Sequence, residues 1–276
     1  MERPNAWKSY DEKAVAELMA VGERYKEYLT YGSGERTFVI LPGLGTRSIL
    51  FSRMMISAAY KRFCDDFTLY VFDRRRNLPP TYTVREMARD TAAAMRALGL
   101  RNADIFGASL GGMTAQFIAI DSPELVRSLV LGSTAPRVNK RLLEVSEKWS
   151  AAAGSGDLAA LTESFLKLLY CDATIEKYGD LLAHMNDGLT AEELRRFSVQ
   201  ARAISDFDAY SELNKIKCPT LVLGVEGDNV VTADASREIA DRLGCELYLY
   251  PDSYGHCVFD EAPDYKDRIL NFLYKH

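Results

Sequence analysis

Gly107-Ala108-Ser109-Leu110-Gly111-Gly112 is the stretch that decides the fold of this chain. It follows the apolar run 104–106, which predicts a short buried strand, and it precedes a helical pattern from about 110 to 121. A serine framed by glycines at a strand-to-helix turn is typical of a nucleophile elbow, since residues without a Cβ let strand and helix approach closely around a strained serine. A purely structural glycine turn is the alternative, so the motif needs partner residues elsewhere.

Strand and helix patterns alternate on both sides of this motif, which predicts an α/β fold with a mostly parallel sheet flanked by helices. Between about 136 and 213, apolar residues recur at helical spacing without a convincing strand. We therefore expect a core made of 1–136 and 213–276, with an all-helical insertion at 137–212. A separate amphipathic helix is expected near the start of the chain. The expected strands are 28–31, 37–41, 67–72, 104–106, 125–131, 220–224 and 246–250, and the expected early helices are 12–29, 49–62, 83–98 and 110–121.

The composition excludes several classes of protein. The chain has 276 residues, 47% of them hydrophobic, and a net charge of -5, which does not favour nucleic-acid binding. Its five cysteines are odd in number, far apart and without a CxxC pair, so neither disulfides nor a metal site are expected. The sequence shows no signal-peptide pattern and no run of about 20 apolar residues that could span a membrane. These features predict a soluble cytoplasmic protein.

A nucleophilic serine needs a base and a group that orients the base, and the chain has only three histidines. His184 falls in the helical insertion and His276 is the last residue. His256 follows the last strand, so a parallel sheet would bring it to the edge that carries Ser109. The orienting carboxylate is expected to be Asp228, which follows the strand 220–224, and Glu226 is the rival. The order Ser109, Asp228, His256 is the one expected with this elbow.

Two further stretches are candidates for binding roles. The backbone N–H groups of Leu110 and of Leu44, in the loop Pro42-Gly43-Leu44-Gly45, are the expected oxyanion donors. In the run 73–77, Arg74 or Arg76 could pair with a substrate carboxylate, although most charge runs are solvated faces. Cys257 next to His256 is expected to be a packed residue rather than a second nucleophile. Aromatic and methionine side chains of the insertion should pack against one another, with a few lining an apolar pocket: Trp149, Phe165, Tyr170, Tyr178, Met185 and Phe197.

Four stretches of the sequence lie around Leu44, Ser109, Asp228 and His256. Together they make the chain resemble the α/β-hydrolase superfamily, and within it the cap-bearing branch of esterases, lactonases and carbon-carbon hydrolases. The resemblance implies an α/β-hydrolase fold with a mostly parallel eight-stranded sheet, and a cap at 137–212 that forms a lid over Ser109. Two departures stand out. Pro42 occupies a position where members commonly have a histidine, and Asp73-Arg74-Arg75-Arg76-Asn77 replaces the frequent Asp-x-Arg-Gly.

The resulting hypothesis is a serine hydrolase that cleaves a carboxylic ester or lactone of a small, largely apolar substrate through an acyl-enzyme. It needs no metal or organic cofactor, and its only expected partner is a small-molecule substrate; the sequence predicts no oligomeric state and no particular acyl chain. Three alternatives use the same residues. They are hydrolysis of a carbon-carbon bond, acyl transfer to an acceptor other than water, and a ligand receptor that retains the triad without turnover.

Overall fold

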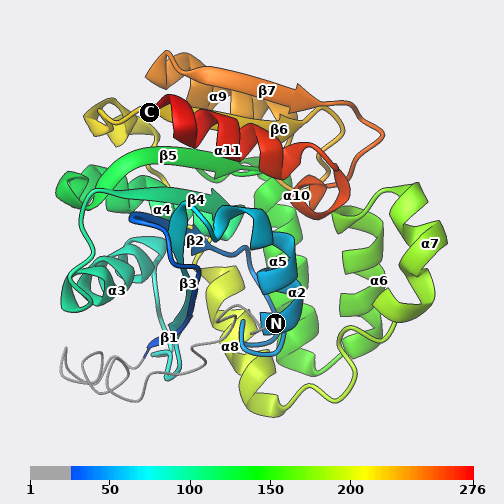
Figure 1. Ribbon diagram of the computed structural model, residues 1–276. Helices are drawn as coiled ribbons and strands as arrows, with labels where there is room; N and C mark the ends of the chain where they lie inside the picture. Colours follow the sequence, from blue (N-terminus) through cyan, green and yellow to red (C-terminus); the bar gives the residue numbers. More distant parts are fainter. Residues whose placement is uncertain (1–25) are drawn as a thin grey trace, which may run out of the picture.

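The computed structural model describes residues 26–276, and a seven-stranded sheet forms its centre (Figure 1). The strand order is β1-β3-β2-β4-β5-β6-β7. Every neighbouring pair is parallel except β1 and β3, which are antiparallel. The strands are β1 (Lys26–Tyr31), β2 (Arg36–Leu41), β3 (Phe67–Arg75), β4 (Ala103–Ala108), β5 (Val126–Gly132), β6 (Thr220–Val225) and β7 (Glu246–Tyr250).

The start of the sheet has two features that the sequence did not predict. The resemblance implied eight strands, whereas residues 26–276 form seven, with β1 pairing only with β3. β1 and β2 are not neighbours, because β2 pairs in parallel with β3 and β4. Gly32 allows the chain to pass over β3 there: its φ is +87°, and a Cβ would lie 2.3 Å from the Phe67 carbonyl oxygen. Of the helix expected over 12–29, residues 26–29 belong to β1 and the rest lies outside the described residues.

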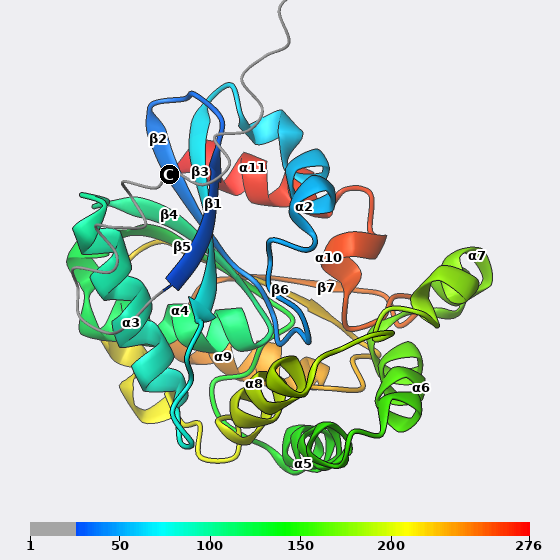
Figure 2. The ribbon, with the colours of Figure 1, turned by 90° about the horizontal axis from the view of Figure 1, so that it is seen from below.

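Helices cover both faces of the sheet, as Figure 2 shows. α3, α4 and α9 pack on one face, while α2, the 3-10 turn η1 and α11 pack on the other. The capping box predicted at Thr83 and Glu86 is present at the start of α3. The helices of these layers are α2 (Arg53–Ala59), η1 (Lys61–Phe63), α3 (Val84–Ala97), α4 (Leu110–Asp121), η2 (Pro123–Leu125), α9 (Ala233–Leu243), α10 (Val258–Glu261) and α11 (Tyr265–Lys275).

A helical insertion separates β5 from β6. Its helices are grouped at the end of the sheet towards which β6 and β7 point (Figures 1 and 2). Trp149, Phe165 and Phe197 pack against one another inside it, with ring centroids 5.1 Å apart for the first pair and 5.7 Å for the second. We define the insertion as α5 (Lys140–Ser155), α6 (Leu158–Leu169), α7 (Asp172–Leu182) and α8 (Ala191–Arg202); the 3-10 turn η3 (Tyr210–Lys215) follows it.

The register of the parallel strands brings four loops to one edge of the sheet. Leu41 at the end of β2 pairs with Gly107, and Ala108 at the end of β4 pairs with Gly132. On the other side, Gly132 pairs with Leu223, and Val225 at the end of β6 pairs with Tyr250. The loops after β2, β4, β6 and β7 therefore leave the sheet side by side, although they are far apart in the sequence.

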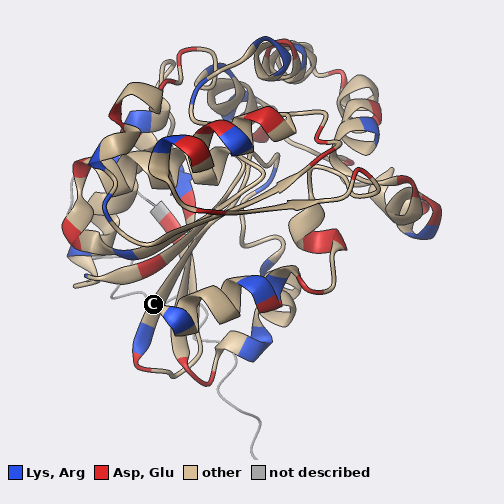
Figure 3. Cartoon of the chain, turned by 90° about the horizontal axis from the view of Figure 1, so that it is seen from above, with Lys and Arg blue, Asp and Glu red and all other residues tan. Residues whose placement is uncertain are grey.

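Charged residues lie mainly on the outer helices. Figure 3 shows Lys and Arg interspersed with Asp and Glu along these helices, while most of the sheet carries neither. Among residues 26–276, no helix has the length and apolar character that crossing a membrane requires.

Candidate active site

Ser109 occupies a strained turn between β4 and α4. Its φ is 51° and its ψ is -119°, a region that residues with a Cβ rarely adopt. Three hydrogen bonds hold this backbone: the Ser109 N–H donates to the Gly132 carbonyl at 2.8 Å, and the Ser109 carbonyl accepts from the Thr134 hydroxyl at 2.7 Å and from the Met113 N–H at 3.1 Å. The flanking glycine is required sterically, because a Cβ on Gly111 would lie 1.9 Å from the Leu41 carbonyl oxygen. The turn thus projects the hydroxyl beyond the sheet edge.

His256 lies opposite this hydroxyl. Its Nε2 is 3.0 Å from Ser109 Oγ, and its Nδ1 is 2.8 Å from Asp228 Oδ2. The imidazole is only 3% exposed. A carboxylate can only accept a hydrogen bond, so Nδ1 carries the proton and Nε2 is left to accept from the serine hydroxyl. This tautomer can take a proton from Ser109.

Asp228 is enclosed in the loop that follows β6, with its side chain 1% exposed. Its second oxygen accepts hydrogen bonds from the Val230 and Val231 N–H groups, at 2.8 and 3.0 Å. Burial raises the pKa of this carboxyl, but the charge of His256 and the three hydrogen bonds outweigh burial and hold the pKa of Asp228 below its usual range. Asp228 is therefore ionised at neutral pH and can stabilise an imidazolium.

The alternative candidates for the base and the orienting carboxylate contact residues outside the site. Glu226, considered as the orienting carboxylate, is 45% exposed and pairs with Arg237. His184 follows α7, is 73% exposed and pairs with Asp187. His276 ends the chain beside Phe272. The structure thus brings together Ser109, His256 and Asp228, whereas Glu226, His184 and His276 contact other residues.

The two expected oxyanion donors flank Ser109. Leu44 lines the cavity beside the serine, and a Cβ on Gly43 would lie 3.4 Å from Ser109 Cβ, so this loop runs in contact with the serine. Leu110 is the first residue of α4, and the first N–H groups of a helix have no partner within it. The positive end of the α4 dipole points to the same place.

Arg74 and Arg76 do not line this cavity. The Arg74 guanidinium is buried and donates to the carbonyls of Gly43 and Pro42, at 2.8 and 2.6 Å. Burial lowers the pKa of Arg74 to about 10, with Asp73 opposing and Arg196 adding to this effect, so the group is still a cation at neutral pH. Arg76 is 67% exposed and lies 3.9 Å from Glu27. The two arginines that were expected near a substrate carboxylate are therefore both absent from the cavity wall, and Arg74 instead fastens the loop that carries Leu44.

A cavity of about 50 Å³ opens at Ser109. Its walls are mostly aromatic and aliphatic, and the insertion supplies part of them through Trp149, Phe165 and Leu169. The Trp149 indole N–H is satisfied by the Ser164 hydroxyl at 3.0 Å, so that ring presents apolar atoms. The remaining lining residues are Gly43, Leu44, Ser109, His256, Cys257 and Phe259, and none of them is a lysine, arginine, aspartate or glutamate.

Cys257 is a buried thiol in this wall. Burial, with the nearby carboxylates of Asp260, Glu261 and Asp228, holds the pKa of Cys257 well above its usual range. Because the thiolate is the reactive form, we expect iodoacetamide at pH 8 to modify Cys257 far more slowly in the folded protein than in urea. Mass spectrometry of the alkylated peptides measures both rates. Fast modification of Cys257 in the folded protein would contradict a buried thiol with a raised pKa.

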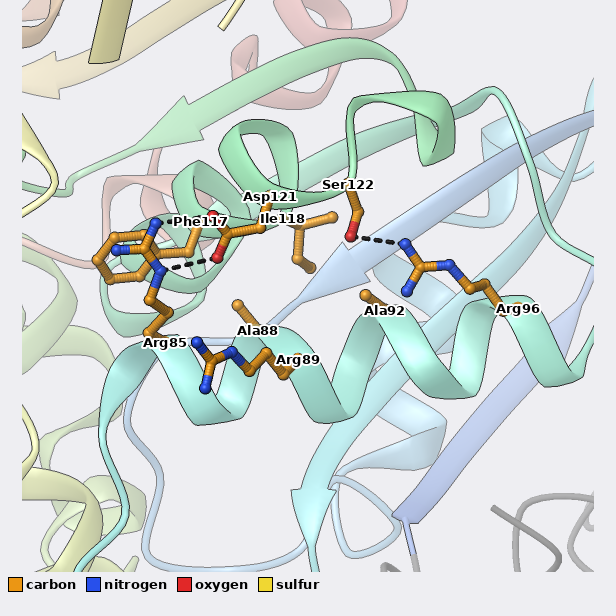
Figure 4. Close-up of a pocket in the computed structure, with 9 residues that line it drawn as sticks. All are labelled: Arg85, Ala88, Arg89, Ala92, Arg96, Phe117, Ile118, Asp121 and Ser122. Carbon is orange, nitrogen blue, oxygen red and sulfur yellow. Dashed lines mark hydrogen bonds and ion pairs between the residues drawn. The ribbon is translucent and has the colours of Figure 1, made fainter. Parts of the chain in front are cut away.

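A larger hollow of about 450 Å³ lies between α3 and α4, at the far end of α4 from Ser109 (Figure 4). Two of its three arginines are paired within the protein: Arg85 bonds to Asp121 and Glu212, and Arg96 bonds to Ser122 and Glu124. Its lining residues contain no serine and histidine pair. Within 26–276, no group of three or more His, Cys, Asp or Glu side chains is placed to hold a metal ion. The cavity at Ser109 is therefore the candidate site.

The sequence reasoning missed Thr134, Leu169 and Phe259. Thr134 stands two residues after β5, so the strand-end argument that identified Asp228 could have identified it as well. Phe259 follows His256 by three residues, at the start of α10, which was a usable signal of proximity. Leu169 has no local signal, because only the packing of α6 against the histidine loop brings it to the cavity.

Comparison with known proteins adds three findings. A family model described as alpha/beta hydrolase fold matches residues 36–263. The putative carbamate hydrolase RutD of Caulobacter sp. (strain K31) is 26% identical over 87% of this chain and 91% of its own length, and that of Pseudomonas syringae pv. syringae is 31% identical over 67% and 73%. The enol-lactonase from Burkholderia xenovorans LB400 shares the fold, with a TM-score of 0.79 and 22% identity over 92% of this chain and 98% of that one.

Proposed function

The chain belongs to the alpha/beta hydrolase fold family, and on that premise we propose that it is a serine hydrolase that cleaves a carboxylic ester or lactone of a small, largely apolar substrate. One observation carries the proposal. Ser109, His256 and Asp228 form an unbroken chain of hydrogen bonds of 3.0 and 2.8 Å at the mouth of an apolar cavity. Nucleophile, base and orienting acid are in the geometry that acyl transfer requires.

In the first half of the proposed reaction, Ser109 Oγ attacks the substrate carbonyl while His256 Nε2 takes the hydroxyl proton. Asp228 holds the imidazole and stabilises the cation that forms. The N–H groups of Leu44 and Leu110 stabilise the negative charge that develops on the carbonyl oxygen. The imidazolium then gives its proton to the leaving alkoxide, and the acyl group remains on Ser109.

In the second half, water attacks the acyl-enzyme and His256 accepts its proton. The tetrahedral intermediate collapses, the carboxylic acid leaves, and the proton returns to Ser109 Oγ. In a lactone the leaving alkoxide belongs to the same molecule, so one product, a hydroxy acid, is released. The cycle uses no oxidant and no co-reactant other than water.

The cavity supports the substrate class. Its small volume suits a short acyl or compact ring, and its aromatic walls provide no cationic partner for a substrate carboxylate. The relatives named as carbamate hydrolases and the structural neighbour named as an enol-lactonase also act at an acyl carbonyl, by their names. We therefore propose an uncharged ester or lactone rather than an anionic one.

A panel of p-nitrophenyl esters from acetate to octanoate, together with neutral lactones, tests the proposal. We expect turnover that falls as the acyl chain lengthens, and fluorophosphonate labelling at Ser109. An absence of both turnover and labelling would overturn the proposal, and a receptor role would then require ligand binding without turnover. Labelling of Ser109 without hydrolysis of any ester or lactone would refute the substrate class and favour carbon-carbon cleavage or acyl transfer.

The Arg74→Ala variant is expected to lower kcat about 10²-fold on neutral esters, with little change in KM. The carbonyls of Pro42 and Gly43 lose their donors, so the loop that carries the Leu44 N–H shifts relative to Ser109. Steady-state kinetics on one neutral and one carboxylate-bearing ester measures the effect. Arg76→Ala, which alters an exposed neighbour, is the control and should be unchanged. A rise in KM confined to the anionic ester would mean that Arg74 binds substrate.

A further inference from the structure

The loop that carries His256 is joined to the helical insertion at the junction of α6 and α7. The Cys257 N–H donates to the Leu169 carbonyl at 2.8 Å. On the other side of the histidine, a Cβ on Gly255 would lie 2.5 Å from that same carbonyl oxygen. The two backbones are therefore in direct contact on both sides of His256, and no side chain separates them.

The Glu261 carboxylate closes this junction. One oxygen accepts a hydrogen bond from the Gly255 N–H at 2.7 Å, and the other accepts one from the Cys171 N–H at 2.8 Å. Gly255 directly precedes His256, while Cys171 is the residue that caps the start of α7. A single carboxylate thus links the histidine loop to the insertion. Hydrogen bonds to an ionised acceptor are stronger than neutral ones, and a negative charge is favoured at the start of a helix.

Glu261 itself stands at the end of the short helix α10, which also contains Phe259 of the cavity wall. Neither Glu261 nor Cys171 is among the residues that line the cavity. Glu261 therefore does not touch the cavity, and its direct contact with the histidine loop is the hydrogen bond from the Gly255 N–H. The distance from His256 Nε2 to Ser109 Oγ, 3.0 Å here, depends on where that backbone lies.

We propose that Glu261 is a positioning residue, which keeps His256 in reach of Ser109 by fastening the histidine loop to the insertion. The catalytic role of Glu261 rests on the proposed function, whereas the hydrogen bonds of the junction are independent of it. If the junction opens, the imidazole remains held by Asp228 yet loses its fixed placement against the serine. The consequence is that the insertion supports the base of the reaction as well as the cavity wall.

The Glu261→Gln variant tests the proposal. A glutamine amide has one acceptor oxygen, so it can receive only one of the two N–H groups. We expect kcat to fall about 10-fold to 10²-fold while KM stays within about twofold, because displacement of a catalytic group affects the transition state more than substrate binding. Glu261→Asp, whose shorter carboxylate keeps both acceptor oxygens, should restore part of kcat.

Asp260→Asn is the matched control, since it removes a carboxylate one residue away whose partner is Lys266, at 3.7 Å. It should leave kcat unchanged. An equal loss of kcat in Asp260→Asn and Glu261→Gln would show a general effect of charge and would overturn the proposal. Wild-type kcat in Glu261→Gln would overturn it as well.

Hydrogen–deuterium exchange provides a readout that does not depend on turnover. In Glu261→Gln, exchange should rise together in the segments 169–171 and 255–257, while the strands β4 and β5 remain protected. Unchanged exchange in both segments would refute the junction, even if the enzyme is active. If the wild-type protein hydrolyses nothing but exchange responds as expected, the proposed function fails and the junction stands.

Discussion

The Ser109→Ala variant is expected to lose about six orders of magnitude in kcat. The variant has no nucleophile, so no acyl-enzyme forms, and the remaining groups can only assist direct attack by water. KM should change little, because the cavity walls are untouched. The measurement is single-turnover and steady-state hydrolysis of the best ester found for the wild-type protein.

Folding must be shown to be intact in that variant. The Ser109 hydroxyl bonds only to His256 among the described residues, so its removal should leave the melting temperature close to that of the wild type. Ser205→Ala, a change of the same size at an exposed hydroxyl that bonds to the end of α8, is the control and should retain full activity. Substantial hydrolysis by Ser109→Ala, or labelling of it by a fluorophosphonate, would place the nucleophile elsewhere.

The His256→Ala variant should show a comparable loss, since a serine without its base is nearly as inactive as no serine. His184→Ala is the matched control, because His184 is also paired with an aspartate but lies exposed beyond α7. The two variants therefore compare an identical chemical change inside and outside the site. Near-normal esterase activity in His256→Ala would refute the triad.

The His256→Ala substitution also affects the stability of the fold. The buried Asp228 carboxylate would lose one hydrogen-bond partner, although the Val230 and Val231 N–H groups remain. We expect a loss of about 1–3 kcal/mol in the free energy of unfolding. His256→Asn, whose amide nitrogen can take the position of Nδ1 and still donate towards Asp228, separates the effects: it should recover stability without recovering activity.

The site could be largely predicted because strand ends and chain order are local properties. A parallel sheet brings the carboxyl ends of its strands to one edge, so a serine after one strand and a histidine after another were expected to meet. The local sequence did not distinguish Asp228 from Glu226 as the partner of His256. They are two residues apart, and only the turn after β6 directs one towards His256 and the other towards Arg237.

Pairing within the sheet was harder to predict than the strands themselves. Apolar runs identified all seven described strands, yet β1 and β2, adjacent in the sequence, are separated by β3. The order of strands in a sheet depends on the path of the segments that connect them, and the residues within β1 and β2 do not indicate which strand lies between the two. The strand count from the resemblance was also one too high for residues 26–276.

The environment of the Arg74 side chain could not be predicted from the sequence either. In the sequence it is one of three consecutive arginines, and nothing distinguishes it from Arg76. In the structure Arg74 is buried and donates to two carbonyls, whereas Arg76 is exposed. The difference arises from the loop after β2, which lies beside the end of β3 only because those strands pair.

By itself, the sequence predicted an α/β fold with a mostly parallel sheet, an elbow at Ser109 and a role for His256, because these follow from periodicity, backbone sterics and a scarcity of histidine, and the resemblance of four motifs implied the α/β-hydrolase fold. Only the tertiary structure decided that the imidazole hydrogen-bonds to Asp228 and not to Glu226, that Arg74 hydrogen-bonds to the loop of Leu44, and that Glu261 hydrogen-bonds to both the histidine loop and the insertion. Each of these depends on contacts between segments far apart in the chain. Such contacts exist only after packing has chosen which surfaces meet.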